Sequence, residues 1–417
     1  MSYLFFSIYL IAGLFIIIRI PFIKKSGLSV GVLALLLMIK ITAGLLAVWL
    51  PYHYAQPNDY WPLHNESINE YHLLWNDPKT FIGNIFYSPY GNHHTGFFSV
   101  VGSYWNDLRT NLVIKILALF NVASRENIYI NVLLLNIIGF IGPIALYRTF
   151  ITILPGKSIA VLTACFLLPS TIFFTSAPGK DLIIFTALSL FIYGIYFSVT
   201  QKANWKKGIL ILLSLLILLL MRNYVVVALI PAAVSFVLGY RKKISPLKIN
   251  LWMYSLLLLL MVVIPMLNHS IQPLQIISKR QQAFLALEKA ASQLPMDTLQ
   301  PNPKSFLQNL PQAINHGFAR PYPWDKGGKF TPFWSVEILG TILLMAFGMI
   351  KRNRSILYRN HFLFFLLSFS IIMFVLTGYI VPNSSSIVRY KCIYLPLLIT
   401  PVLCILFDKR NNYNHIK

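Results

Sequence analysis

The stretch GILILLSLLILLLMRNYVVVALIPAAVSFVLGY, residues 208–240, contains two apolar runs separated only by Arg222 and Asn223. Neither run, 208–221 or 224–240, contains a charged residue. A helix of about 20 apolar residues crosses a bilayer, so the stretch predicts two consecutive membrane helices with a very short turn between them. We therefore expect an all-α polytopic membrane protein.

The whole chain agrees with this local pattern. Its 417 residues are 57% hydrophobic and 11% charged, with a mean hydropathy of +0.66, well above that of soluble domains. The same length rule predicts about 11 spans in a single integral membrane domain, 1–417, of the inner (plasma) membrane. The predicted spans are 3–19, 27–50, 129–147, 158–177, 182–199, 208–221, 224–240, 250–267, 332–350, 361–380 and 392–407.

Basic residues are distributed unevenly between the predicted connections. Lys and Arg number 35 against 12 Asp and Glu, giving a net charge of +23. Nineteen of the 35 lie in short connectors on one side, which the positive-inside rule makes cytoplasmic. The charge thus indicates an N-out, C-in orientation and not a nucleic-acid partner. These connectors are 19–26, 148–157, 201–207, 241–249, 351–360 and 408–417.

Two long connections fall on the opposite, extracytoplasmic side, at 51–128 and 268–331. Ten of the 12 acidic residues also fall on this side, so we expect any active site to open outward. Within the first connection, 66–75 and 110–121 have apolar faces but are too short to cross, which predicts amphipathic helices lying on the membrane.

The stretch SAPGKDLIIF, residues 176–185, places a charged pair at a short outer turn. Pro178 and Gly179 end one predicted helix, and Lys180 and Asp181 open the next. A capped interfacial turn with a snorkelling Lys180 explains the pair equally well. Arg222 follows an apolar run of about 21 Å, shorter than the hydrocarbon core, and is therefore drawn below the outer surface. A shallow hairpin that reaches the headgroups is the alternative.

Three further cations lie near the outer ends of predicted spans: Arg320 in ARPYPW, and Arg389 with Lys391 in the loop VPNSSSIVRYK, 381–391. With Lys180 and Arg222 they make five cations at about the same depth. Arginine binds phosphate oxygens bidentately, so the five predict a phosphate-binding group. Each alone could instead bind anionic headgroups of the membrane lipid.

Candidate catalytic bases come from the same side of the membrane. They are Asp59, Glu66, Asp107 and Asp181, because a carboxylate can deprotonate an acceptor hydroxyl. Helix capping is an alternative for Glu66, and a local salt bridge with Arg109 is an alternative for Asp107.

Histidine spacing does not favour a metal centre. The pairs His64 with His72 and His93 with His94 have no partner at zinc-site spacing. No cofactor is therefore expected, although a carboxylate of the first loop could bind a divalent metal.

Three segments together resemble a known group of proteins. TIFFTSAPGKD (171–181), FARPYPWD (318–325) followed by Glu337, and PNSSSIVRYK (382–391) are similar to motifs of bacterial polytopic proteins from capsule, exopolysaccharide and O-antigen gene clusters. The resemblance implies a membrane glycosyltransferase or repeat-unit polymerase, a polyprenyl-(pyro)phosphate-linked saccharide as substrate, and polysaccharide-assembly proteins as partners. Lipid-sugar-dependent transferases place their acidic motif just after the first helix, whereas Asp59 follows the second.

The leading hypothesis is sugar transfer at the extracytoplasmic face. The five cations would stabilise the phosphate leaving group, and one of the carboxylates would be the base. A flippase for a lipid-linked oligosaccharide could use the same cations in an alternating-access cavity. A structural membrane subunit is the third interpretation, and in it Lys180 and Arg222 would be replaceable.

Overall fold

The computed structural model describes residues 2–54, 58–87, 103–269, 271–286, 292–326, 330–350 and 360–407. It is 82% helical, and within these ranges no strand is formed. The all-α prediction is therefore confirmed. The predicted connectors 351–359 and 408–417 lie outside the described residues, as do His93 and His94.

Seven described helices are long and apolar enough to cross a membrane, or eight if one bent pair counts as a single span. The protein is thus a membrane protein by composition and helix length. The count of about 11 spans and the orientation stay predictions. The seven segments are Val30–His53 (α3), Ile128–Ile153 (α7 and α8), Lys180–Thr200 (α11), Asn223–Lys242 (α13), Pro246–Leu267 (α14), Thr331–Ile350 (α17) and His361–Ile380 (α19).

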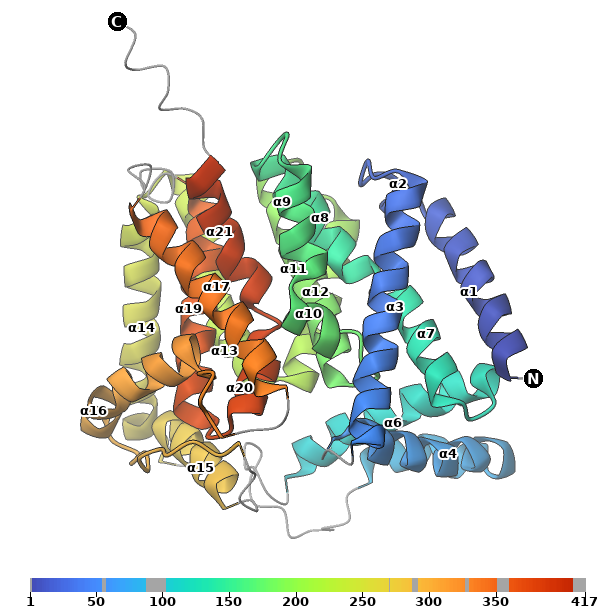
Figure 1. Ribbon diagram of the computed structural model, residues 1–417. Coiled ribbons are helices and arrows are strands. Elements are labelled where there is room, and N and C mark those ends of the chain that lie inside the picture. The colour runs from blue at the N-terminus through green and yellow to red at the C-terminus, as the bar shows by residue number, and fades with distance from the viewer. Residues whose placement is uncertain are drawn as a thin grey trace, which may run out of the picture.

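These helices run side by side in a bundle (Figure 1). Helices from both long connections gather at its lower end in that view: α4 (Tyr60–Asn76), α6 (Tyr104–Ser124), α15 (Pro273–Leu285) and α16 (Pro303–Ile314). The predicted helical stretches 66–75 and 110–121 lie within α4 and α6. We call this end of the bundle the loop end, and the other the turn end.

Buried amides join the helices of the first connection to the bundle. Asn121 of α6 donates to the hydroxyl of Ser67 on α4 at 3.0 Å, and accepts from Asn131 of α7 at 2.6 Å. All three side chains are buried. Because each amide or hydroxyl left unbonded there would cost stability, this chain of hydrogen bonds fixes α4 and α6 against the transmembrane helices.

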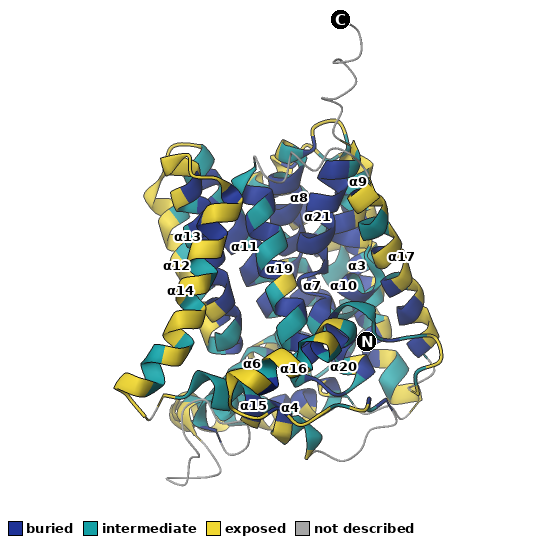
Figure 2. Ribbon diagram, turned by 90° about the vertical axis from the view of Figure 1, so that its left-hand side faces the viewer, coloured by how far each residue is buried: buried dark blue, intermediate teal, exposed yellow. Residues whose placement is uncertain are grey.

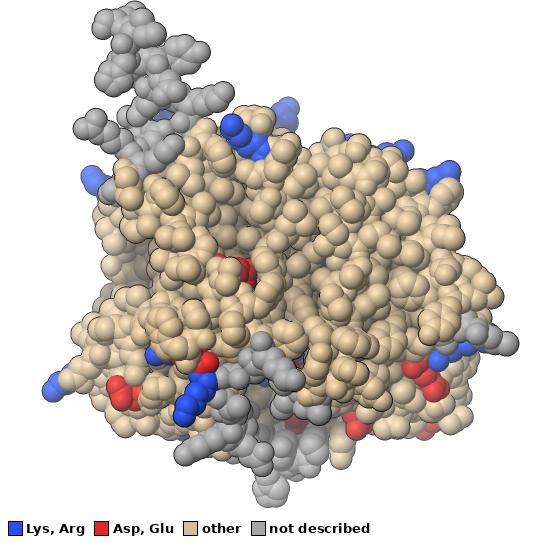
Figure 3. Space-filling model, in the orientation of Figure 1, with Lys and Arg blue, Asp and Glu red and all other residues tan. Residues whose placement is uncertain are grey.

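Buried residues lie between the central helices, and outer helices such as α14 turn exposed faces outward (Figure 2). The exposed residues of α14 include Leu251, Leu256 and Leu258. Fully buried rings such as Phe236 of α13 and Phe365 of α19 stack at 5.9 Å. By contrast, only 11% of the apolar 18-residue segment of α14 is buried inside the protein. On the face shown in Figure 3, basic side chains lie along the upper edge, and both signs of charge lie along the lower edge. Apart from one small acidic patch, the belt between them is uncharged, as expected for a surface in contact with lipid.

Two predicted segments differ in the structure. The predicted span 158–177 is broken into α9 (Ser158–Leu162), a π-turn (Thr163–Leu167) and α10 (Pro169–Phe174), because Pro169 has no N–H to continue the helix. The predicted loop 381–391 is in fact helix α20 (Ser384–Lys391), which is bent by 63° from α21 (Leu395–Phe407). The Asn383 side chain starts α20 by accepting from Ser385 N at 3.2 Å.

Candidate functional site

The turn that presents Lys180 and Asp181 is held by α3 and α7. Lys40 of α3 is buried, and its ammonium donates to the carbonyl of Thr175 at 2.9 Å and contacts the Ser176 hydroxyl at 3.1 Å. The amide of Asn136 donates to the Ser176 carbonyl at 2.7 Å. A side chain at Gly44 would place its Cβ 2.5 Å from that same carbonyl oxygen. The start of α11 is therefore positioned by close backbone packing and by a buried cation.

Asp181 is the centre of an ion-pair group at the loop end. Its side chain is 2% exposed, and its two oxygens accept from two different arginines. Arg222, between α12 (Trp205–Met221) and α13, donates from Nη2 at 2.5 Å, and Arg389 of α20 donates from Nε at 2.6 Å. A buried carboxylate needs such partners to remain charged. Asp181 thus joins three segments, and each of its carboxylate oxygens already accepts from an arginine.

Asp59 joins the same group from its outer side. Nη1 of Arg389 donates to Oδ2 of Asp59 at 2.7 Å, while the Asp59 side chain is 64% exposed. The ring of Tyr60 lies 5.7 Å from the Arg389 guanidinium, and burial raises the pKa of the Tyr60 hydroxyl. Of the two carboxylates in the group, Asp59 is the one that is oriented by an arginine and open to water.

A group of four cations, of which only Arg222 has an ion-pair partner among the described residues, lies beside these pairs. Arg109 of α6 is packed where burial, together with the charges of Arg280 and Arg222, lowers its pKa to about 10. Its Nε is buried without a hydrogen-bond partner among the described residues. Lys180 also interacts electrostatically with Arg109, and its Nζ donates to Thr110 of α6 at 2.9 Å. We call Arg109, Lys180, Arg222 and Arg280 the cation group.

The charge of the cation group is only partly balanced. Arg222 is paired with Asp181, but Arg109, Lys180 and Arg280 form no ion pair within the described ranges of the chain. Like charges brought together at a partly buried site repel one another. A bound anion would relieve this repulsion, and the unbonded N–H of Arg109 is a donor it could use.

Arg320 and Lys391 belong to a neighbouring but separate arrangement. Arg320 is paired with Asp325, which also accepts from the backbone N of Tyr322 at 2.7 Å. The buried ammonium of Lys391 donates to the carbonyl of Arg320 at 2.7 Å. Glu337 of α17 interacts electrostatically with Lys391, and its carboxylate accepts from the backbone N of Ser170 at 3.0 Å. These contacts connect α17, α20 and the start of α10.

The predicted site residues therefore lie in two neighbouring arrangements. Lys180, Arg222, Arg389, Asp59 and Asp181 come together, and Arg320 and Lys391 lie in the adjacent arrangement. Lys180 is partly buried, and its Nζ donates to Thr110 of α6.

Two of the predicted bases lie on helices of the first connection. Glu66 is exposed on α4, where it accepts from the Asn69 side chain at 3.5 Å. Asp107 lies in the first turn of α6, the helix that carries Arg109.

Arg109 and Arg280 were not predicted as site residues. The local salt bridge of Arg109 with Asp107 was the alternative, but residues two apart on a helix do not face each other. That spacing was the signal that could have directed Arg109 to another partner. Arg280 is one of two adjacent basic residues, with Lys279, on the amphipathic stretch 273–285, and nothing local distinguishes it.

Among the described residues, no group of three His, Cys, Asp or Glu side chains is arranged to hold a metal ion. Searches of family models, curated proteins and solved structures give no match to this chain.

Proposed function

We propose that the protein transfers sugar from a polyprenyl-(pyro)phosphate-linked saccharide, as a membrane glycosyltransferase or repeat-unit polymerase of surface-polysaccharide biosynthesis. The observation that carries the proposal is the cation group, in which three of four cations lack an ion-pair partner within the described ranges. It lies at the loop end, on α6, α11, α15 and the residue before α13, and in this proposal the phosphate of a lipid-anchored donor binds there. Phosphate is the anion that clustered arginine and lysine donors bind best.

In this proposal the donor phosphate occupies the cation group. Arg109, Lys180 and Arg280 bind its oxygens and stabilise the negative charge that develops as the bond from the anomeric carbon to the phosphate oxygen breaks. The electron pair of that bond leaves with the phosphate. Because these donors are held by α6, α11 and α15, they need little rearrangement when the charge develops.

Asp59 is the proposed base. It removes the proton from the acceptor hydroxyl, whose oxygen then forms the new bond to the anomeric carbon. Arg389 holds one carboxylate oxygen at 2.7 Å, and the exposure of the side chain leaves the other approachable from water. Asp181 acts by positioning Arg222 and Arg389, which places it behind the reacting groups.

The test separates binding from chemistry. Purified full-length protein is mixed with a lipid-linked saccharide, and both its affinity and the product are measured for Arg109→Gln, Lys180→Gln and Asp59→Asn. Removing a charged donor should weaken binding about 10-fold or more. Asp59→Asn should leave binding intact and lower turnover by about 10²–10⁴-fold. Lys202→Gln is the matched control, because Lys202 is an exposed cation in the connector between α11 and α12.

The same assay addresses the competing functions. Movement of a fluorescent lipid-linked saccharide across vesicles, with no product and no effect of Asp59→Asn, would replace the transferase with a flippase. Unchanged affinity in both Arg109→Gln and Lys180→Gln would contradict the phosphate site itself and leave a structural subunit.

A further inference from the structure

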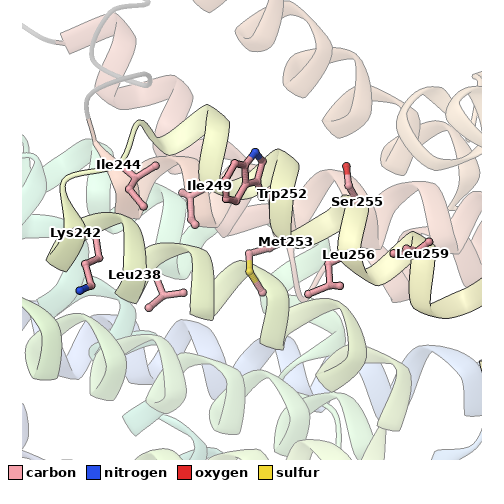
Figure 4. Close-up of a pocket in the computed structure, with 9 residues that line it drawn as sticks. All are labelled: Leu238, Lys242, Ile244, Ile249, Trp252, Met253, Ser255, Leu256 and Leu259. Atoms are coloured by element: carbon pink, nitrogen blue, oxygen red, sulfur yellow. The ribbon is translucent and has the colours of Figure 1, made fainter. Parts of the chain in front are cut away.

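A groove lies on the lipid-facing side of the bundle, between α13 and α14 (Figure 4). Its volume is about 680 Å³, within the range of about 300–1,000 Å³ typical of small-molecule sites. The lining residues are Leu238, Lys242, Ile244, Ile249, Trp252, Met253, Ser255, Leu256 and Leu259. Apart from Lys242 and Ser255 they are apolar, so the occupant must be mainly hydrocarbon.

The groove is far from the cation group. Arg222 immediately precedes α13 and Lys242 ends it, so the 20 residues of this helix separate them by about 30 Å. The basic end of the groove is therefore at the turn end, and a phosphate bound at Lys242 would not contact the proposed donor site.

One end of the groove is strongly basic. Lys242 lines it, and Arg241 at the end of α13, Lys243 in the turn and Lys248 at the start of α14 are close to it in sequence. All four are exposed and form no ion pair with any described residue. Moreover, no acidic residue occurs anywhere between Asp181 and Glu288 in the sequence. Within the described residues the positive charge of this turn is therefore unbalanced, and an anionic partner could balance it.

The rest of the groove suits an acyl chain. Trp252 is 76% exposed, and Leu256 and Leu259 follow it along α14 at spacings of four and three residues, which puts the three on one face. Tryptophan is enriched at the membrane interface, where its ring lies at the headgroup level. The groove therefore matches a phospholipid part by part. Its basic end would face the phosphate, Trp252 would lie at the headgroup level, and the apolar channel would hold an acyl chain.

We propose that this groove binds an anionic phospholipid of the membrane, with an acyl chain between α13 and α14 and the phosphate against Lys242. The basic turn selects anionic over zwitterionic headgroups by charge. The apolar groove retains the lipid by burying its chain. This lipid is distinct from the saccharide donor proposed for the loop end.

The experiment uses full-length protein in detergent, with phosphatidylglycerol and phosphatidylcholine of identical acyl chains as probes. Bound lipids are counted by native mass spectrometry across a titration. Wild type should bind phosphatidylglycerol more tightly, and Lys242→Ala should weaken that binding about five-fold. Lys202→Ala, an exposed cation of a different connector, should not. Equal affinity for the two lipids, or an unchanged affinity in Lys242→Ala, overturns the proposal.

A second variant tests the apolar part. Leu256→Trp fills the groove without changing its charge, and should reduce the binding of phosphatidylglycerol while the melting temperature stays at the wild-type value. Quenching of Trp252 by a brominated phosphatidylglycerol, measured as the difference between wild type and Trp252→Phe, then locates the chain. Retained binding in Leu256→Trp, or no quenching of Trp252, would show that the lipid is held elsewhere.

Discussion

The two ends of α13 carry arginine and lysine under opposite conditions. At the loop end, the Arg222 side chain is 9% exposed and pairs with Asp181 at 2.5 Å. At the turn end, Arg241, Lys242 and Lys243 are exposed and have no ion pair with described residues. A charge removed from water requires a partner, whereas one at the headgroup level is solvated by water and lipid phosphate. Exposure therefore decides which cations are part of the folded architecture and which remain available.

Breaking the buried pair should have the largest effect. Asp181→Asn leaves Arg222 and Arg389 without their shared carboxylate, and loss of one partner of a buried pair costs about 3–5 kcal/mol. The melting temperature of the purified protein in detergent should fall sharply.

Asp59→Asn is the control for this prediction, because it removes a carboxylate that is 64% exposed from the same Arg389. It should cost no more than about 1 kcal/mol. Equal melting temperatures for Asp59→Asn and Asp181→Asn would show that burial does not distinguish the two carboxylates.

The backbone that supports the buried pair gives the next effect. Gly44→Ala on α3 would place a Cβ 2.5 Å from the Ser176 carbonyl oxygen, so either α3 or the turn before Lys180 must move. Overpacking of this kind costs about 1–3 kcal/mol. The change should lower both the melting temperature and the affinity for a lipid-linked saccharide.

Gly31 lies on the same helix, and a Cβ there meets nothing within 4 Å. Gly31→Ala should therefore be neutral or slightly stabilising. Similar losses in Gly31→Ala and Gly44→Ala would mean that helix composition, and not the contact with Ser176, is responsible.

Part of the loop end could be predicted from the sequence for a simple reason. Charged residues inside or next to apolar spans seek polar partners, so Lys180, Arg222, Arg320, Arg389 and Lys391 were expected together. Lys180, Arg222 and Arg389 lie with Asp181, whereas Arg320 and Lys391 lie in the adjacent arrangement. Their pairing could not be predicted, because Asp181 meets Arg222 across 41 residues and Arg389 across 208. Asp181 was a candidate base from the sequence, and the structure shows that it is also the partner of two arginines.

The same argument explains the errors in the fold. Hydropathy indicates that 158–177 and 392–407 are buried in the membrane or the core, but it does not show where a helix breaks. The break before Pro169 depends on a local N–H that proline lacks, and the α20–α21 bend depends on packing of Arg389 and Lys391 toward partners distant in sequence. Arg109 was missed because the charged residues near it, Arg280 on α15 and Arg222 before α13, are distant in sequence.

A buried histidine at the loop end should make the stability of the protein depend on pH. His316 is 2% exposed, with Nδ1 unbonded among the described residues. Burial, with the charge of Arg320, lowers its pKa from 6.5 to about 4, against the opposing charges of Asp325 and Asp297. Between these two values the unfolded chain binds the proton and the folded chain does not, so stability should fall as the pH drops from 6.5 to 4.

His316→Asn should remove this part of the acid sensitivity, on the order of 1 kcal/mol at pH 5 after allowance for screening. Melting temperatures of wild type and variant at pH 7 and pH 5 measure it, and the shared carboxylates cancel in the difference. If the melting temperatures of wild type and His316→Asn fall by the same amount from pH 7 to pH 5, His316 is not the group responsible for the acid sensitivity.

The smallest effect is expected at the turn end of α13. Lys243→Gln removes a cation that is exposed and unpaired within the described residues, so the free energy of unfolding should change by less than about 0.5 kcal/mol. The melting temperature in a detergent micelle should match wild type. In vesicles of phosphatidylglycerol the same change should lower the melting temperature slightly, because one contact with the anionic surface is lost. A large fall in the melting temperature in detergent would mean that Lys243 has a protein partner. The cations at both ends of α13 would then be part of the folded architecture.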